Sequence, residues 1–562
     1  MTSNERTPTD VDRIAEEWVD TAVELNPVLG TYIGRKDADA AFGDYSPEGL
    51  ERSAEALRRT ISRLDAASPA DEVDVVTVAD LRSELALDLE AHELGLPLRD
   101  LNVIASPAQE LREVFDLMST EGADDWQTIS TRLAALPAAL DGYIETLRLG
   151  IARGIVPAKR QVREVTAQAR KLERNDGFFA EFAGSAPGAL PATLRTDLAG
   201  RAAHAGAAYA RLASFLEHEL LPAAGDADAV GRDIYALQSR RFLGATIDLD
   251  ETYEWGIDEL ARMVAEQESI ANEILGSAQS TGSGDSVREA IALLDGDPSR
   301  KLHGTDALQR WMQETSDRAV AELAGTQFDI PSEIRTLECM IAPTQEGGIY
   351  YTGPSDDFSR PGRMWWSVPE GVTEFDTWRE LTTVYHEGVP GHHLQIGQAV
   401  VNRGKLNTWR RQLAGTSGHA EGWALYAERL MQGLGYLDDP ADRLGMLDGQ
   451  RMRAARVVLD IGVHLGKQRP DGGGQWTGEY AFEFLSQNVN MNEGFIRFEV
   501  NRYLGWPGQA PSYKVGQRIW EQLRDEVAER EGDAFSIKQF HKRALDIGGV
   551  GLDTLRTALL AR

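Results

Sequence analysis

The chain of 562 residues carries 58 Lys and Arg against 89 Asp and Glu, which gives a formal net charge of −31 at pH 7. This excess of acid argues against nucleic acid and anionic membrane surfaces as partners, because both need clustered Lys and Arg. Apolar residues make up 42%, enough for a sizeable core, and nowhere do eighteen of them run together as a membrane span requires.

The single cysteine, Cys339, excludes an internal disulfide and a cysteine-based metal site, and we expect a buried, unreactive thiol. The polar N-terminal sequence has no apolar stretch of signal-peptide length. We therefore expect a cytoplasmic protein.

Residues 1–10 are predicted to be a disordered tail, and residues 11–272 to form an N-terminal helical lobe. Good helix formers dominate this part, and Leu57, Ile61 and Leu64 keep the spacing of one helix face. The Gly- and Ser-rich run 276–285 predicts a loop, either a lobe boundary or a surface excursion.

Residues 273–562 are predicted to form the catalytic part. Short, aromatic segments between about residues 328 and 368 indicate two or three strands. Helices return from Thr373, which we expect to cap the next helix with Asp376 as its partner. The prediction is a mainly α protein: a large, two-lobed helical bundle around a deep cleft, with a small β-sheet beside the active site.

The run from Tyr385 to Gln395 is the most informative motif. Three of the ten histidines lie within eight residues, and Glu387 directly follows His386. His-Glu opens the signature of zinc hydrolases in which a helix supplies imidazole ligands and a carboxylate base. Since Pro390 occupies the fifth position, the plain His-Glu-x-x-His motif is absent.

A regular helix would not bring these histidines together. His392 would lie about 240° around the helix from His386, and His393 about 10 Å along its axis. Pro390 and Gly391 predict a bulge or kink that can bring a later histidine back beside His386. We favour His392 as the second ligand, with His393 as the alternative; the other histidine would support the ligands or the transition state.

Glu421 is the predicted third ligand. It lies 34 residues after Glu387, in a helical stretch for which Ser417 is the expected N-cap. It shares one face with Glu428 and with small and apolar residues, which is unusual for a solvated helix. Two histidines and a glutamate would hold one Zn²⁺ and leave a position for water.

The chemistry follows from charge. Zinc lowers the pKa of its bound water and polarises a substrate carbonyl, and Glu387 would carry the proton from water to the leaving amine. Tyr513, in a Pro- and Gly-rich loop, is a candidate donor to the developing oxyanion. Arg502 would hold a substrate carboxylate, or simply pair with Glu499.

Several of these motifs resemble the bacterial family called "domain of unknown function 885". The strong likenesses are His386 to Gln395, Glu421 to Ala424, Arg502-Tyr503, and Pro507-Gly508-Gln509 through Tyr513-Lys514; weaker ones are Ser359 to Gly362 and Arg232 to Met263. The resemblance covers about Val11 to Leu560. The family is similar in plan to thimet oligopeptidase, angiotensin-converting enzyme and carboxypeptidase Taq.

Those helical zinc peptidases have two lobes around a deep channel and a small sheet at the site. They carry His-Glu-x-x-His, so this chain has two extra residues between its histidines; dipeptidyl peptidase III, with one extra residue, is a precedent for a bulged version. The resemblance implies the fold and a peptidase-like activity. The residues predicted to bind substrate are Tyr350, Tyr351, Arg360, Gln509 and Lys514.

We predict a zinc-dependent hydrolase of amide bonds in short peptides, with no nucleic-acid or membrane partner. A strand near Tyr350 could pair with an extended peptide, and Tyr350, Tyr351, Trp365 and Trp366 form either a wall of the site or ordinary core packing. The alternatives are a hydrolase of non-peptide amides or esters and a non-catalytic peptide-binding protein. A Ser or Cys hydrolase is disfavoured, since there is no Gly-x-Ser-x-Gly elbow. The oligomeric state is left open.

Overall fold

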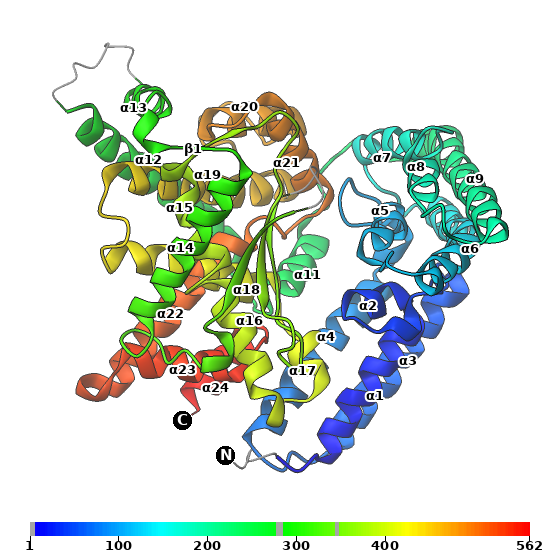
Figure 1. The fold of residues 1–562 in the computed structure, drawn as a ribbon, viewed down its shortest axis with the longest axis horizontal. Coiled ribbons are helices and arrows are strands. Elements are labelled where there is room, and N and C mark those ends of the chain that lie inside the picture. The colour runs from blue at the N-terminus through cyan, green and yellow to red at the C-terminus, as the bar shows by residue number, and fades with distance from the viewer. Residues whose placement is uncertain (1–5, 277–284, 343–347, 562) are drawn as a thin grey trace.

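The computed structural model describes residues 6–276, 285–342 and 348–561. Within these ranges the chain is mainly helical with two small sheets, which confirms the predicted fold class. Figure 1 shows the two lobes, with the N-terminal helices in blue and cyan on one side and the rest of the chain on the other.

The helices of the first part follow one another with short connections. They are α1 (Asp10–Leu25), α2 (Pro27–Tyr32), α3 (Pro47–Ala66), α4 (Glu72–Glu93), α5 (Pro107–Glu113), α6 (Ala123–Arg153), α7 (Lys159–Leu172), α8 (Phe178–Gly184), α9 (Ala192–Phe215), α10 (Leu221–Ala223), α11 (Arg232–Leu243) and α12 (Leu249–Leu275). Short tight turns, including η2 (Leu96–Arg99), connect some of them.

The second part contains the strands and the remaining helices. The strands are β1 (Lys301–His303), β2 (Leu337–Ile341), β3 (Ile349–Thr352), β4 (Gly362–Trp366) and β5 (Glu374–Asp376). The helices are α13 (Ser286–Asp295), α14 (Thr305–Leu323), α15 (Thr377–Glu387), α16 (His392–Val401), α17 (Thr408–Gln412), α18 (Ser417–Gly433), α19 (Pro440–Leu465), α20 (Gly478–Asn488), α21 (Glu493–Gly505), α22 (Ser512–Glu531), α23 (Ile537–Ile547) and α24 (Leu552–Leu560). The short η6 (Ser332–Ile334) precedes β2.

Two hydrophobic cores explain the two lobes. Helices α5 to α9 bury their own cluster, which includes Leu133, Leu140 and Tyr209. A second and larger cluster extends from α11 to α24, and in it α12 packs along α19 and α18 packs against α22. Because α11 and α12 belong to this second core, the cores divide nearer residue 230 than the predicted boundary at residue 272.

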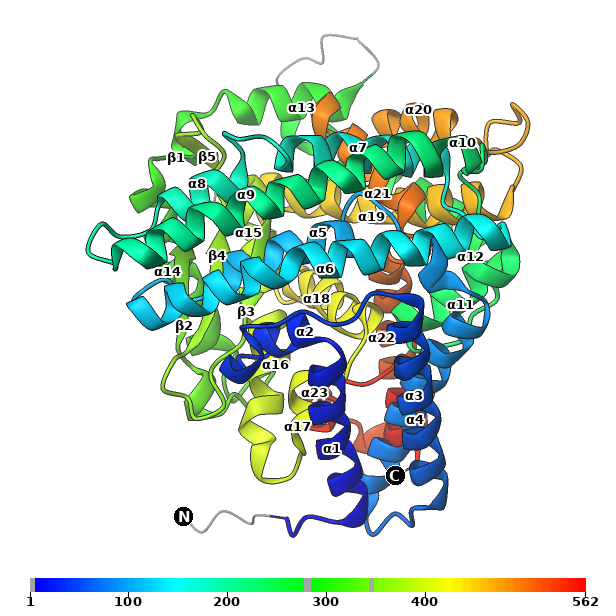
Figure 2. The same ribbon diagram turned by 90° about the vertical axis from the view of Figure 1, so that its right-hand side faces the viewer.

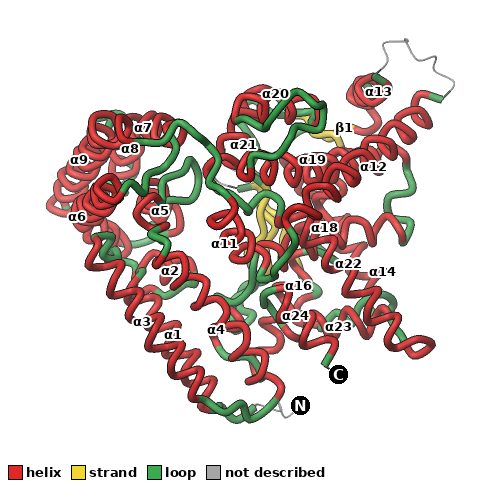
Figure 3. Tube along the Cα trace, turned by 180° about the vertical axis from the view of Figure 1, so that it is seen from behind, coloured by secondary structure: helices red, strands yellow, loops and turns green. Residues whose placement is uncertain are grey.

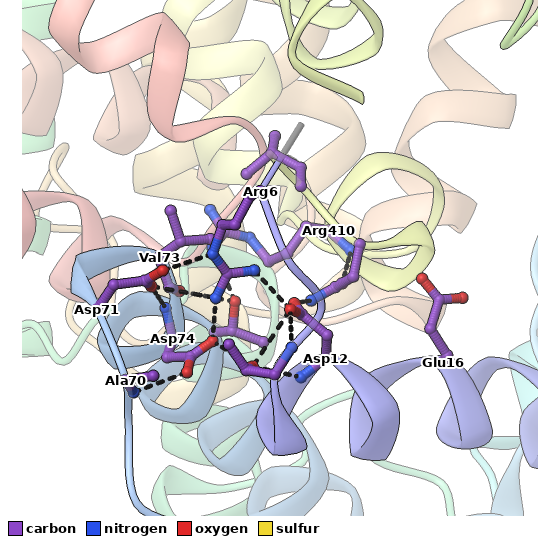
Figure 4. A network of polar contacts seen from close by, with 12 residues as sticks. Arg6, Asp12, Glu16, Ala70, Asp71, Val73, Asp74 and Arg410 are labelled. Atoms are coloured by element: carbon purple, nitrogen blue, oxygen red, sulfur yellow. Dashed lines mark hydrogen bonds and ion pairs between the residues drawn. The ribbon is translucent and has the colours of Figure 1, made fainter. Parts of the chain in front are cut away.

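A third cluster joins the two parts. Helices α1, α3 and α4 pack together and also enclose Trp409 of α17, as the side-by-side helices in Figure 2 illustrate. Polar contacts reinforce this junction (Figure 4). The Arg6 guanidinium lies 2.5 Å from carboxylate oxygens of Asp12 and Asp71 and also pairs with the fully buried Asp74.

The three-stranded sheet has the order β2-β4-β3, so β3 and β2 are its edges; β4 is parallel to β2 and antiparallel to β3. Figure 3 shows these strands set among the helices of the second part. They are the strands predicted between residues 328 and 368, of which residues 343–347 lie outside the described ranges.

The predicted start of the motif helix at Thr373 is wrong. Residues Glu374–Asp376 form β5, which pairs antiparallel with β1, and Lys301 Nζ lies 2.8 Å from Asp376 Oδ1. Asp376 is the N-cap, and α15 begins at Thr377. A pairing between segments more than seventy residues apart overrides the local capping pattern.

Among the described residues, none of the helices combines the length and the apolar character needed to cross a bilayer. Of the predicted N-terminal tail, residues 1–5 lie outside the described ranges, while α1 begins at Asp10.

Candidate metal centre

The motif helix is interrupted rather than bulged. Helix α15 ends at Glu387 and α16 begins at His392, with residues 388–391 between them and a cis peptide bond before Pro390. Gly391 lies so close to the preceding turn that a Cβ atom there would sit 1.8 Å from the carbonyl oxygen of His386. Only glycine therefore permits this return of the chain.

The interruption brings the two predicted imidazole ligands together. The rings of His386 and His392 lie 4.9 Å apart between centroids and are perpendicular. Glu421 Oε2 lies 3.3 Å from His386 Nε2 and 3.6 Å from His392 Nε2. In the part of the chain that the structure describes, these three residues are the group with ligand atoms within 4.8 Å of one another.

The donor set fits a divalent metal ion. Two ligand atoms about 2.0–2.1 Å from a tetrahedral ion are separated by about 3.3 Å, which matches the two Glu421 distances. Glu421 Oε2 is buried and has no hydrogen-bond partner despite its two imidazole neighbours. An unpaired buried carboxylate oxygen is costly, and an ion between the three side chains would satisfy it.

Close helix packing positions Glu421. Helix α18 is capped by Thr416, whose hydroxyl accepts from His419 N at 3.2 Å, so the predicted cap at Ser417 is wrong by one residue. A Cβ on Gly422 would lie 2.4 Å from the Gly516 backbone, so α18 and α22 approach closely at this point. This contact places the first turn of α22 beside Glu421.

Glu428 holds the other side of the His386 ring. Its Oε1 lies 2.8 Å from His386 Nδ1, and its Oε2 accepts from Gln450 Nε2 at 3.0 Å. Gln450 Oε1 in turn accepts from Lys514 Nζ at 2.6 Å, and Lys514 pairs with Glu259 at 2.9 Å. A buried polar chain thus runs from the candidate ligand through α18, α19 and α22 to α12.

The charges and the burial of the centre shift the pKa values of His386 and Glu387. Burial lowers the pKa of His386, but Glu421 and Glu428 outweigh it and raise this pKa to about 10. Burial raises the pKa of Glu387 above its ordinary value, opposed by the nearby His392 and His386. A raised pKa suits a carboxylate that exchanges protons with water.

His393 lies away from the centre. Its Nε2 donates to the Ile334 carbonyl at 2.9 Å, and its Nδ1 lies 2.9 Å from the Tyr351 hydroxyl. The ring is fully buried, and burial lowers the pKa of His393 to about 4, so it is neutral. Both ring nitrogens are therefore engaged, and His393 joins α16 to the edge strand β3. Of the two alternatives, this geometry favours His392 as the ligand.

Tyr513 is close enough to Glu421 to feel its charge, and it packs against the arginines of α19. The Tyr513 ring is 5.1 Å from the Arg456 guanidinium carbon, and burial together with the charge of Glu421 raises the pKa of Tyr513. Arg502 binds both oxygens of Glu499, at 3.1 and 3.3 Å, and donates to Gln509 Oε1 at 2.6 Å. Arg502 thus pairs with Glu499, one of the two roles predicted for it, and also binds Gln509, while its buried Nε has no hydrogen-bond partner.

The other residues predicted to bind substrate are divided between surface and interior. Tyr350 on β3 is exposed and stacks on Trp365, whereas Tyr351 contacts His393. Arg360 donates to the Gly353 carbonyl of its own loop at 2.8 Å. Lys514 is buried in the polar chain described above. The structure therefore brings Tyr513 near the candidate ligands and leaves Tyr350 open to a ligand along the strand.

A cavity of about 800 Å³ lies between the two parts of the molecule. Its walls come from α4, α5 and α11 and from the segment after α21, and it reaches Thr416 at the start of α18. The three candidate ligands are outside its lining. The cavity thus borders the N-terminal end of α18 rather than the candidate ligands, and its size suits a small molecule or short peptide.

Sequence reasoning missed a row of polar residues on α19. Gln450, Arg453, Arg456 and Asp460 recur at three- and four-residue spacing and so share one face of a helix that is otherwise largely apolar. Arg456 donates to the Tyr503 hydroxyl at 2.6 Å and to Glu499 at 2.8 Å. Polar residues at helical spacing inside a buried helix were the signal that could have indicated this face.

The model of the bacterial protein family of unknown function DUF885 matches residues 27–559. A candidate lipoprotein from Colwellia psychrerythraea has 22% identity and a TM-score of 0.82 over 99% of each chain. A candidate lipoprotein of unknown function from Shewanella oneidensis has 16% identity and a TM-score of 0.76 over 98% of this chain and 100% of its own. At these identities the likeness shows the fold alone.

A carboxypeptidase from Pyrococcus furiosus aligns with a TM-score of 0.35 and 13% identity over 91% of this chain and 95% of its own. This likeness is too low to carry an argument. Among curated proteins, none matches this chain.

Proposed function

The chain belongs to the bacterial DUF885 family, and we propose that it is a metal-dependent hydrolase that cleaves amide bonds in short peptides. The observation that carries the proposal is the convergence of His386, His392 and Glu421 within 4.8 Å, directly beside Glu387. Two imidazoles, one carboxylate and an adjacent carboxylate base are the set that zinc hydrolases of amides use.

His386 Nε2, His392 Nε2 and Glu421 Oε2 would hold the ion, and we propose Zn²⁺ because it takes such mixed nitrogen and oxygen ligands in tetrahedral sites. When bound, the ion supplies Lewis-acid chemistry, since it acidifies water and polarises a carbonyl. Glu428 fixes His386 by accepting a hydrogen bond from Nδ1, which leaves Nε2 free as a ligand.

Glu387 accepts a proton from water as the water oxygen bonds to the amide carbon. It then passes this proton to the amide nitrogen as the carbon–nitrogen bond breaks, so the products are one carboxylic acid and one amine. We assign Tyr513 as the donor to the oxygen that becomes negative in between. Its raised pKa keeps the phenol protonated and able to donate.

Two features support the proposal that the amide substrate is a peptide. The edge strand β3 presents backbone groups beside Tyr350, and an extended peptide can add to such an edge. The cavity between the two parts, whose lining ends at Thr416 and does not include the candidate ligands, is large enough for a short peptide and too small for a folded domain. The predicted cytoplasmic location stays a prediction, because the two solved relatives are described as candidate lipoproteins; cell fractionation tests it.

Metal analysis tests the site. We expect the purified full chain to bind about one ion, and His386→Ala, His392→Ala and Glu421→Ala each to lose it. His303→Ala is the matched control, because this histidine lies on β1 with an exposed side chain. Retention of the ion by all three ligand variants would contradict the assignment.

Turnover tests the base. Glu387→Gln keeps the shape of the side chain but removes its ability to accept a proton, so we expect it to keep the ion and to lose about 10²-fold or more in kcat. Cleavage of a mixture of short peptides by the metal-loaded chain, read by mass spectrometry, is the measurement. If the metal-loaded wild type binds peptides but cleaves no peptide, amide or ester, the protein is a binding protein and the proposal fails.

A further inference from the structure

Helix α19 carries Arg453 beside the candidate centre, and no ion pair joins this arginine to any other residue that the structure describes. On the polar face of α19, Gln450 is bonded to Glu428 and Lys514, and Arg456 is bonded to Tyr503 and Glu499. Arg453 lies between them, one turn from each. Among the described residues it makes no ion pair, and its buried Nε has no hydrogen-bond partner.

Arg453 faces the reacting groups. Its guanidinium carbon lies 6.0 Å from the centre of the Tyr513 ring. Its charge favours the ionised forms of both Glu387 and Glu428, although burial still leaves the pKa of Glu387 raised. The guanidinium lies along α19 over Gly449, where a Cβ atom would be 2.6 Å from Nη1. Gly449 therefore leaves room for Arg453 at the side of the centre.

The neighbouring arginines are already neutralised. Arg456 and Arg502 share the carboxylate of Glu499, and despite its burial they hold the pKa of that carboxyl at about 2. A substrate carboxylate could reach either of them only by displacing Glu499. Arg453 has no such carboxylate partner among the described residues, and its buried Nε, which lacks a hydrogen bond, is costly unless a partner arrives.

We propose that Arg453 binds a carboxylate of the substrate, so that the scissile amide lies next to a free carboxylate group. The planar guanidinium suits this role, because its paired donors match the two oxygens of a carboxylate. Two sources supply this chemistry: the C-terminal carboxylate of a short peptide, which would make the enzyme an exopeptidase, and an acidic side chain. The inference rests on the proposed hydrolase function and narrows its substrate class.

Three matched peptide sets test the inference with the metal-loaded full chain. The first consists of acetyl-Xaa-Ala peptides with a free C-terminal carboxylate, and the second of the same peptides as C-terminal amides. The third consists of acetyl-Xaa-Asp amides, which carry the carboxylate on the side chain. We expect kcat/KM to be about tenfold to hundredfold higher for the carboxylate that is recognised than for the second set, as charge-assisted hydrogen bonds give.

Variants identify the residue. We expect Arg453→Met to bring the ratio of kcat/KM between acid and amide close to one, mainly through KM, and Arg453→Lys to keep part of it. Arg443→Met is the matched control. Arg443 lies on the same helix, about 15 Å along the axis from Arg453, and pairs with Glu273. Metal content and circular dichroism show whether each variant is folded. The ratio of kcat/KM between acid and amide peptides in the wild type tests carboxylate recognition even if a variant does not fold.

The outcomes separate this inference from the function on which it rests. Equal cleavage of all three sets by the wild type would overturn carboxylate recognition while leaving the hydrolase intact. A strong preference for a carboxylate that survives Arg453→Met would overturn the assignment to this residue. Absence of cleavage in every set, together with a full complement of metal, would overturn the hydrolase and this inference with it.

Discussion

Glu421 and Glu428 lie two turns apart on α18 and contact opposite sides of the His386 ring. Glu421 Oε2 approaches Nε2, and Glu428 Oε1 approaches Nδ1 at 2.8 Å. Because Glu428 accepts a hydrogen bond from the N–H at Nδ1, it fixes the tautomer that leaves Nε2 available to a metal ion. The shared face of the two acids was predictable from their spacing, but the orientation of the imidazole between them was not.

His541 is a buried histidine with no part in the candidate centre. It stacks on Phe328 with 4.6 Å between ring centroids, and its Nε2 lies 2.9 Å from the Tyr426 hydroxyl. Burial lowers the pKa of His541 to about 4. The unfolded chain, with an ordinary pKa near 6.5, therefore binds more protons than the folded chain between about pH 6.5 and pH 4, and stability falls as pH decreases through this range.

We predict that His541→Gln weakens this pH dependence, since glutamine stays neutral. His541 alone would cost the wild type about 2 kcal/mol between pH 6.5 and pH 5. The measurement is the thermal unfolding midpoint of wild type and variant at pH 7.5 and pH 5. An equal fall in both proteins would show that His541 is not a source of the acid sensitivity.

At the scale of elements, five helices, α15, α18, α19, α22 and α12, are joined by the polar chain from His386 through Glu428, Gln450 and Lys514 to Glu259. Each buried member of this chain has a partner at hydrogen-bond distance. A satisfied buried network orients its members, so the position of His386 depends on α19 and α22 as well as on α18.

We predict that Lys514→Met weakens metal binding by about 10- to 100-fold, because residues that orient metal ligands have effects of this size. Lys542→Met is the control, since Lys542 pairs with Asp546 within α23. Competition with a chelator measures the affinity without reference to turnover. An affinity equal to that of the control would show that the chain does not orient His386.

The interruption between α15 and α16 gives a second prediction. Gly391→Ala places a methyl group against the His386 carbonyl, so we expect the two histidines to separate and metal binding to be lost. Gly433→Ala, at the end of α18, meets nothing within 4 Å and serves as the control. Full metal content in Gly391→Ala would mean that the chain accommodates the methyl group without moving its ligands.

Local patterns predicted the helices, the strand segments and the break at Pro390. They did not predict the pairing of β1 with β5. Because of this pairing, α15 begins at Thr377 instead of at the predicted Thr373. They also did not reveal that Lys514 pairs with Glu259, because that partner lies on a helix far away in the sequence. Spacing within one helix identifies a shared face, whereas contacts between helices depend on the fold.

At the scale of the whole molecule, Arg6 connects the start of the chain to α1 and α4, and α1 in turn packs on α17 (Figure 4). Its guanidinium compensates Asp12 and Asp74, which are both buried. Asn407, just before α17, donates to Asp12 at 3.0 Å, so the same group of charges touches both parts of the chain.

We predict that Arg6→Ala destabilises the protein by about 3 kcal/mol, because it leaves buried carboxylates without their cation. Arg13→Ala removes an exposed ion pair with Asp10 and should cost less than about 1 kcal/mol. Thermal unfolding midpoints of the two variants compare the effects. Equal midpoints would mean that the carboxylates near Arg6 find other compensation.

Two walls of the cavity, α11 and α4, are held together by ion pairs whose stability depends on the salt concentration. Arg240 lies 2.6 Å from Glu90 and Arg241 lies 2.9 Å from Asp88, which joins α11 to α4 through partly exposed ion pairs. Added salt weakens such surface ion pairs, since the Debye length falls from about 10 Å at 0.1 M to about 3 Å at 1 M, and it affects buried groups much less. Ionic strength should therefore change how readily the two walls separate and admit a molecule, while the buried centre keeps its geometry.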